Sequence, residues 1–174
     1  NIPKCLIEFN GKPFLYYQLR YLKKNNIKNV IISSCYLSNK ISSYVKKNID
    51  FKKVKIINDG KPLGTGGAII KSLKYLSNNF FVIYGDSFLN FSLNKLKIKS
   101  NLATMAIFKN NNKYDRSNII LKKSKKILYF KKKTNKKLVY IDYGASYLSK
   151  KIFKYEKKGI KFDLSQFFER ISKL

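Results

Sequence analysis

The feature that most constrains the fold is an alternation of short apolar runs with segments of helical periodicity. In the first half of the chain, Leu15, Leu19 and Leu22 recur at helical spacing, whereas the run from Phe80 to Tyr84 is continuously apolar and short. Such alternation predicts βαβ units and a mainly parallel sheet that is covered on both faces. The expected strands are 30–32, 54–57 and 80–84, and the expected helices are 14–25, 37–47 and 67–76.

The second half of the chain has a different pattern, with more strands and fewer helices. A lysine turn separates two short apolar segments, which is typical of a hairpin. We therefore expect antiparallel additions at the edge of the sheet. The expected strands are 102–108, 118–121, 127–130 and 139–148, and the expected helices are 150–156 and 164–174.

Length and composition indicate one compact domain. The 174 residues are 44% hydrophobic, enough to bury a sizeable core. No apolar run approaches the roughly 20 residues of a membrane span, and no signal peptide is recognisable. A cytoplasmic protein is therefore expected. The chain does not begin with Met, which indicates a fragment or a domain from a longer chain.

The formal net charge of +29 suggests either a polyanionic partner or a lysine-rich drift in composition. Only Arg20, Arg116 and Arg170 are arginines among the 38 basic residues, and the lysines are spread along the chain. Proteins that read nucleic acids usually use arginine for bidentate contacts. The pattern therefore favours solvated lysine faces, and a nucleic-acid-binding domain is the less favoured alternative.

The absence of histidine narrows the possible chemistry. It removes Ser-His-Asp and Cys-His catalysis, and two cysteines, Cys5 and Cys35, make a zinc site or a disulfide framework improbable. An enzyme of this composition must use carboxylates, lysines, backbone amides and a hard metal ion.

A glycine-rich loop at 62–68 (Pro-Leu-Gly-Thr-Gly-Gly-Ala) lies between an expected strand and an expected helix. Glycines there let the backbone approach a ligand, and the helix N-terminus would offer free N–H groups to it. The spacing matches neither a Walker loop nor the dinucleotide fingerprint. A tight loop chosen for steric reasons explains the pattern equally well.

Three charged residues are candidates for ligand contacts. Asp86, in the segment 84–87 (Tyr-Gly-Asp-Ser), follows an apolar strand, where open α/β sheets bind ligands and where a carboxylate could hold Mg²⁺; a turn or N-cap role is the alternative. Lys4 follows Pro3 and could neutralise a phosphate. Asp142 lies in an otherwise apolar strand, so it either meets a partner or ligand or points to solvent.

The order of these motifs resembles the sugar-1-phosphate nucleotidyltransferase family. The resemblance is carried by the segments 2–6, 10–15, 62–68 and 84–87, and by 140–146 (Tyr-Ile-Asp-Tyr-Gly-Ala-Ser). It spans nearly the whole chain, and it is nearest to the heptose- or mannose-1-phosphate guanylyltransferase-like branch. A regulatory relative that binds a nucleotide sugar without catalysis is the second alternative.

The resemblance implies a Rossmann-like, three-layer α/β fold with a mixed, mainly parallel sheet, and a reaction between a nucleoside triphosphate and a sugar 1-phosphate with Mg²⁺. A homo-oligomer is left open. The implied nucleotide-binding residues are Leu63, Gly64, Thr65, Gly66, Tyr84 and Gly85; Asp86 would hold the metal, with Lys4 beside the phosphates; and Lys132, Asp142 and Gly144 would bind the sugar phosphate.

The chain also departs from the family pattern. The family opens with a glycine-rich loop ending in Thr-Arg, and it supplies a second acidic metal ligand from a later segment. Residues 1–174 contain neither, so we expect a single domain truncated at both ends and nearly inactive by itself. Cys5 stands where Pro or Ala is usual, and lysines replace a Glu-Lys pair near Lys132, which puts one sugar contact in doubt.

Overall fold

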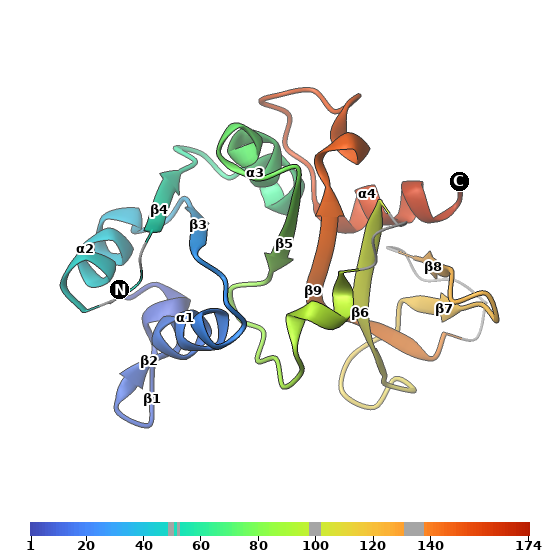
Figure 1. Ribbon diagram of the computed structural model, residues 1–174, viewed down its shortest axis with the longest axis horizontal. Coiled ribbons are helices and arrows are strands. Elements are labelled where there is room, and N and C mark those ends of the chain that lie inside the picture. The colour runs from blue at the N-terminus through green and yellow to red at the C-terminus, as the bar shows by residue number, and fades with distance from the viewer. Residues whose placement is uncertain (49–50, 52, 98–101, 131–137) are drawn as a thin grey trace.

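The computed structural model describes residues 1–48, 51, 53–97, 102–130 and 138–174. These residues form an α/β structure in which a two-stranded parallel sheet and a five-stranded antiparallel sheet lie beside each other (Figure 1). The parallel pair joins β3 (Asn29–Ser34) to β4 (Lys53–Asn58). A small hairpin of β1 (Glu8–Phe9) and β2 (Lys12–Pro13), which the sequence did not predict, precedes the first helix.

Four α-helices are present in the described part of the chain. In the first one, Leu15 and Leu19 are both buried, as their spacing of four residues requires. The third helix begins at Gly64 and not near residue 67, so the glycine-rich loop forms its first turn. The bounds are α1 (Phe14–Lys24), α2 (Ser38–Asn48), α3 (Gly64–Ser72) and α4 (Leu164–Ser172). Short 3₁₀ helices occupy Lys4–Leu6, Leu73–Tyr75, Leu93–Leu96 and Lys150–Phe153.

The five-stranded sheet is organised around its longest strand, β9 (Tyr140–Ser149). This strand pairs antiparallel with β5 (Asn79–Ile83) and with β6 (Ala103–Lys109). The hairpin of β7 (Ile119–Leu121) and β8 (Ile127–Tyr129) extends the sheet, with Ile119 opposite Tyr140.

The expectation of a mainly parallel sheet is wrong, because β3 and β4 form the one parallel pair in the described chain. The apolar run of β5 predicted a strand correctly, with Phe80 buried and 81–83 partly buried, but such a run carries no information on the direction of its partner. That partner is β9, which follows it in the sequence by more than 50 residues and runs antiparallel to it. The expectation of antiparallel strands in the second half is confirmed, but β9 lies inside the sheet and not at its edge, because it pairs with β5, β6 and β7.

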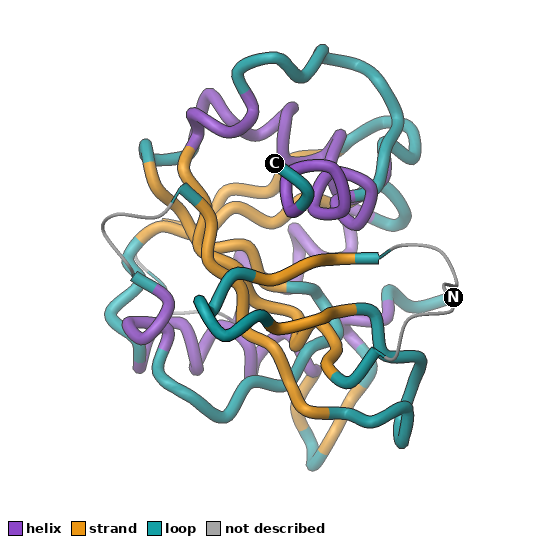
Figure 2. Tube along the Cα trace, turned by 90° about the vertical axis from the view of Figure 1, so that its right-hand side faces the viewer, coloured by secondary structure: helices purple, strands orange, loops and turns teal. Residues whose placement is uncertain are grey.

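Side chains of the large sheet alternate between two hydrophobic cores, one on each face. Phe80 and Leu148 lie in the core with Phe167 of α4, whereas the next residue in β5, Phe81, packs in the core around Leu93. Helix α4, which lies next to the C-terminus, covers one face (Figure 2). The segment containing Leu93 packs against the other face. A third core lies among α1, α2 and the β3–β4 pair.

Candidate functional site

The carboxyl end of β5 continues into a tight turn that carries Asp86. Ser87 N–H donates to the carbonyl of Tyr84 at 3.2 Å, and Gln18 of α1 donates its side-chain amide to that same carbonyl at 2.9 Å. Asp86 is exposed in the middle of this turn, with Gly85 exposed beside it. The arrangement leaves the carboxylate accessible to a ligand while the flanking backbone is held by hydrogen bonds.

The second predicted segment, Asp142 to Gly144, meets this turn because β9 pairs with β5. The Tyr84 hydroxyl donates to Asp142 Oδ2 at 3.0 Å, and the Gly144 N–H donates to Asp142 Oδ1 at 2.9 Å. The backbone is also joined, since Tyr84 N–H donates to the Gly144 carbonyl at 3.0 Å. The structure therefore brings together the metal-binding and sugar-binding candidates, which are separated by more than 50 residues in the sequence.

Gly144 is required at its position by geometry. Its φ is +81°, and a Cβ atom there would lie 1.9 Å from Ser87 Oγ. Any other residue would push the turn that bears Asp86 away from β9. Ser87 was quoted in the motif without a role, and its packing against Gly144 had no signal in the sequence.

Asp142 does not point to solvent, which decides between the two possibilities left open by the strand pattern. Burial raises the pKa of its carboxyl group, and the hydrogen bonds from Gly144 and Tyr84 partly offset that rise. Burial, with the nearby Asp142 charge, also raises the pKa of the Tyr84 phenol, which therefore acts as a hydrogen-bond donor. Asn118 supports the strand by accepting the Asp142 N–H at 3.2 Å.

The glycine-rich loop has a different geometry from the one expected. The N–H groups of Gly66 and Gly67 are not free, because both donate to the carbonyl of Phe162, at 3.0 and 3.3 Å. A Cβ on Gly66 would lie 2.1 Å from the Phe162 ring, and one on Gly64 would lie 2.5 Å from the Phe162 carbonyl oxygen. The steric explanation of these glycines is thus supported, and the expectation of free helix N-terminal donors is wrong at these two residues.

A ligand could still approach the outer side of this loop. Thr65 is exposed, whereas Leu63 is buried and accepts the Phe162 N–H at 3.1 Å. Thr65 Oγ1 also accepts the Leu164 N–H at 2.8 Å, so it links α3 to the start of α4. The crossing of the loop by residues 160–163 could not be found from the sequence, because no local pattern specifies this contact.

A cavity of about 1160 Å³ lies between α1 and β3 on one side and α3 and β5 on the other. Its lining includes Thr65 of the glycine-rich loop together with Tyr84 and Gly85 at the end of β5. The cavity also reaches Ile31 and Ser33 of β3. Three of the nucleotide-binding candidates therefore face a common space, which is large enough for a small-molecule ligand.

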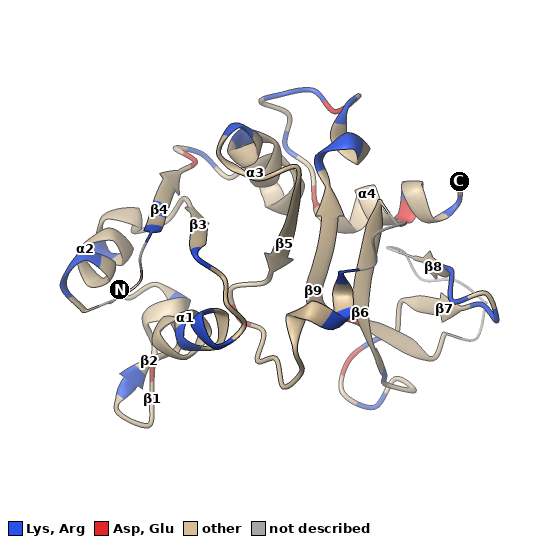
Figure 3. Cartoon of the chain, viewed as in Figure 1, with Lys and Arg blue, Asp and Glu red and all other residues tan. Residues whose placement is uncertain are grey.

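Of the two lysine candidates, the structure describes Lys4 alone. Lys4 lies in the first 3₁₀ helix, and its side chain is exposed. Lys132 lies outside the described residues. In the described part of the chain, basic residues occur on helices, strands and loops and are not gathered on one element (Figure 3). This distribution matches the expectation of solvated lysine faces.

Asp86 suits magnesium better than it suits a metal held by protein ligands alone. Within the described residues, no group of three or more His, Cys, Asp or Glu side chains is placed to hold a metal ion. Magnesium usually keeps several waters and is bound through one or two carboxylates and substrate phosphates. A single exposed carboxylate at the end of β5 fits that mode of binding.

This α/β architecture, with a cavity beside a strand-end carboxylate, has the features of a nucleotide-binding enzyme. A family model described as nucleotidyl transferase matches residues 1–169. The chain belongs to this nucleotidyl transferase family. Within the described residues, none of the helices is long and apolar enough to cross a membrane.

Two bacterial relatives match almost the whole chain. A D-glycero-alpha-D-manno-heptose 1-phosphate guanylyltransferase of Campylobacter jejuni is 35% identical over 170 residues, which are 97% of this chain and 76% of the relative. The enzyme of the same name from Aneurinibacillus thermoaerophilus is 30% identical, over 96% of this chain and 74% of its own length.

Solved structures agree with this assignment. The crystal structure of HddC from Yersinia pseudotuberculosis complexed with GMP-PN is similar with a TM-score of 0.80 and 28% identity, over 95% of this chain and 75% of that one. An inositol-1-phosphate CTP transferase from T. maritima also has a TM-score of 0.80, but at 18% identity it supports the fold alone.

Proposed function

We propose that the protein transfers a guanylyl group from GTP to a heptose 1-phosphate or mannose 1-phosphate and releases pyrophosphate, for surface polysaccharide synthesis. The observation that carries the proposal is the junction of the Asp86 turn with Asp142 and Gly144, because it joins a strand-end carboxylate to the second candidate segment. The two relatives named as heptose 1-phosphate guanylyltransferases support the choice of GTP and heptose.

The reaction would be an in-line displacement. An oxygen of the sugar phosphate attacks the α-phosphorus of GTP, a new oxygen–phosphorus bond forms, and the bond to the β-phosphate oxygen breaks so that pyrophosphate leaves. Such a transfer depends on positioning and on neutralisation of charge more than on a nucleophilic side chain. A chain without histidine is compatible with this chemistry.

We assign the residues to the two substrates as follows. Asp86 would hold Mg²⁺, which when bound neutralises charge on the triphosphate, and Lys4 would lie beside the phosphates. Asp142 would accept a hydrogen bond from a sugar hydroxyl, Gly144 would line the sugar pocket with its backbone, and Lys132 would neutralise the sugar phosphate. The nucleobase and ribose would meet Leu63, Gly64, Thr65, Gly66, Tyr84 and Gly85.

The reaction would take place in the cytoplasm, where nucleoside triphosphates are available.

Asp142 is assigned to the sugar because the phenol of Tyr84 and the N–H of Gly144 fix its carboxylate in one orientation. A fixed acceptor discriminates between sugar hydroxyls better than a mobile one does, because less side-chain entropy is lost on binding.

The test is the variant Asp86→Asn in the protein expressed from its whole gene. We expect pyrophosphate release with GTP, Mg²⁺ and heptose 1-phosphate to fall by roughly 100-fold or more, since a bound metal ion stabilises transition-state charge by several kcal/mol. Glu8→Gln is the matched control, because Glu8 is an exposed carboxylate on β1. Unchanged turnover in Asp86→Asn would contradict the assignment of Asp86.

A further inference from the structure

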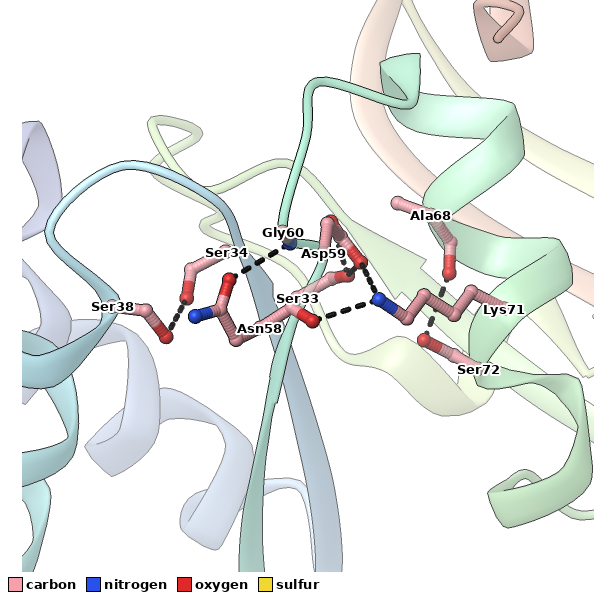
Figure 4. A network of polar contacts seen from close by, with 9 residues as sticks. All are labelled: Ser33, Ser34, Ser38, Asn58, Asp59, Gly60, Ala68, Lys71 and Ser72. Carbon is pink, nitrogen blue, oxygen red and sulfur yellow. Dashed lines mark hydrogen bonds and ion pairs between the residues drawn. The ribbon is translucent and has the colours of Figure 1, made fainter. Parts of the chain in front are cut away.

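A polar cluster that the reaction does not use joins the ends of β3 and β4 to α3. Lys71 Nζ donates to the carbonyl of Asn58 at 2.8 Å and lies 4.0 Å from Asp59 Oδ1 (Figure 4). Ser33 Oγ donates to the same Asp59 carboxylate, at 3.0 and 3.2 Å from its two oxygens. We call Ser33, Asp59 and Lys71 the strand–helix brace.

The strand–helix brace lies at one end of the loop that leads into the glycine-rich turn. Asn58 closes this end by accepting the Gly60 N–H at its side-chain oxygen, at 2.9 Å. The other end is held by Phe162, whose N–H donates to the Leu63 carbonyl and whose carbonyl accepts from Gly66. Residues 60–63 are therefore fixed at both ends, by contacts from different parts of the chain.

Burial and charge indicate that the contact is specific. The side chain of Asp59 is only 7% exposed. Asp59 is also one of only 9 acidic residues in a chain with 38 basic residues. The side chain of Lys71 is 39% exposed, so its ammonium group retains water on one side. An ion pair of this kind adds little to stability, but it restricts where α3 lies relative to the end of β4.

We propose that Lys71 and Asp59 are positioning residues for the nucleotide. Through Asn58 and Ser33 they set the path of residues 60–63, and so the position of the Leu63–Thr65 backbone that would meet the nucleobase. This inference rests on the proposed function. It predicts that the strand–helix brace acts on nucleotide binding and leaves the chemical step unchanged, because the proposed function assigns the metal and the phosphates to Asp86 and Lys4 and not to Asp59 or Lys71.

The experiment measures the Kd of GTP by titration, together with KM and kcat, in the protein from the whole gene. Lys71→Met keeps the aliphatic stem and removes the charge, and we expect it to raise the Kd and KM for GTP roughly tenfold while kcat changes less than about twofold. Lys71→Arg should restore most of the affinity, because arginine can donate to the Asn58 carbonyl. Lys47→Met, an exposed lysine of α2, controls for the loss of one positive charge and should bind GTP normally.

Two outcomes separate this inference from the function on which it rests. Lys71→Met that binds GTP as tightly as the wild type would overturn the inference. Wild-type protein that binds no GTP would instead contradict the proposed function. If Lys71→Met fails to fold, Asp59→Asn is the second variant, because it keeps the size of the side chain; it too must weaken GTP binding with kcat retained.

Discussion

At the scale of single residues, the structure gives Asp142 a definite environment. Its carboxyl group lies between the Tyr84 hydroxyl and the Gly144 N–H, and burial raises its pKa. The sequence placed Asp142 in a strand but did not decide on which face of the sheet its side chain lies, because side chains alternate between the two faces along a strand. The partner that decides the direction comes from β5, which is distant in the sequence.

The raised pKa of Asp142 predicts a dependence of stability on pH. As the pH rises above about 4, Asp142 loses its proton in the unfolded chain before it does so in the folded protein. Burial of this carboxyl group therefore lowers the free energy of unfolding at neutral pH. We expect Asp142→Asn to be more stable than wild type near neutral pH, on the order of 1 kcal/mol. The asparagine side chain can replace both hydrogen bonds of Asp142, because it can accept the Gly144 N–H with its oxygen and donate its amide N–H to the Tyr84 hydroxyl oxygen.

Urea unfolding at several pH values checks this prediction. The advantage of Asp142→Asn should shrink as the pH falls through the raised pKa toward the ordinary value, because wild-type Asp142 then becomes neutral in both states. A difference between the two proteins that does not vary with pH would contradict the account of the Asp142 environment.

At the scale of elements, local periodicity predicted most helices and strands, but it did not predict their partners. Helix α1 and strand β9 appear within one or two residues of their expected bounds, because their apolar spacing is regular. The helix expected at 150–156 is only a 3₁₀ helix from Lys150 to Phe153. The direction of the sheet was missed because pairing is decided by tertiary contacts.

The glycine-rich turn of α3 gives the clearest prediction at this scale. In Gly66→Ala the new Cβ would meet the Phe162 ring, so this ring must shift away from α3. We expect the free energy of unfolding to fall by about 1–3 kcal/mol despite the better helix propensity of alanine. Thermal unfolding measures the loss.

Gly85→Ala is the matched control for that measurement. A Cβ at Gly85 would have no other atom within 4 Å, so this variant should keep nearly wild-type stability. Equal stability of Gly66→Ala and wild type would show that Phe162 does not pack against the helix as described.

At the scale of the whole molecule, the site depends on two sheets and the space between them. The family resemblance assigned Tyr84 to the nucleotide and Asp142 and Gly144 to the sugar, and these three residues are joined by hydrogen bonds. It could not predict that Phe162 would occupy the helix N-terminus, or that Lys71 would reach the end of β4. Contacts of this kind depend on how α3 docks, which no single segment encodes.

The most direct test of the central claim is a substrate panel with the protein expressed from its whole gene. Pyrophosphate release would be measured with GTP, CTP, UTP and dTTP, each with Mg²⁺ and either heptose 1-phosphate or mannose 1-phosphate. We predict release with GTP and one of these sugars, with the matching GDP-sugar identified by mass spectrometry. Folded protein that releases pyrophosphate with no pair, or only with another nucleotide, would contradict guanylyl transfer.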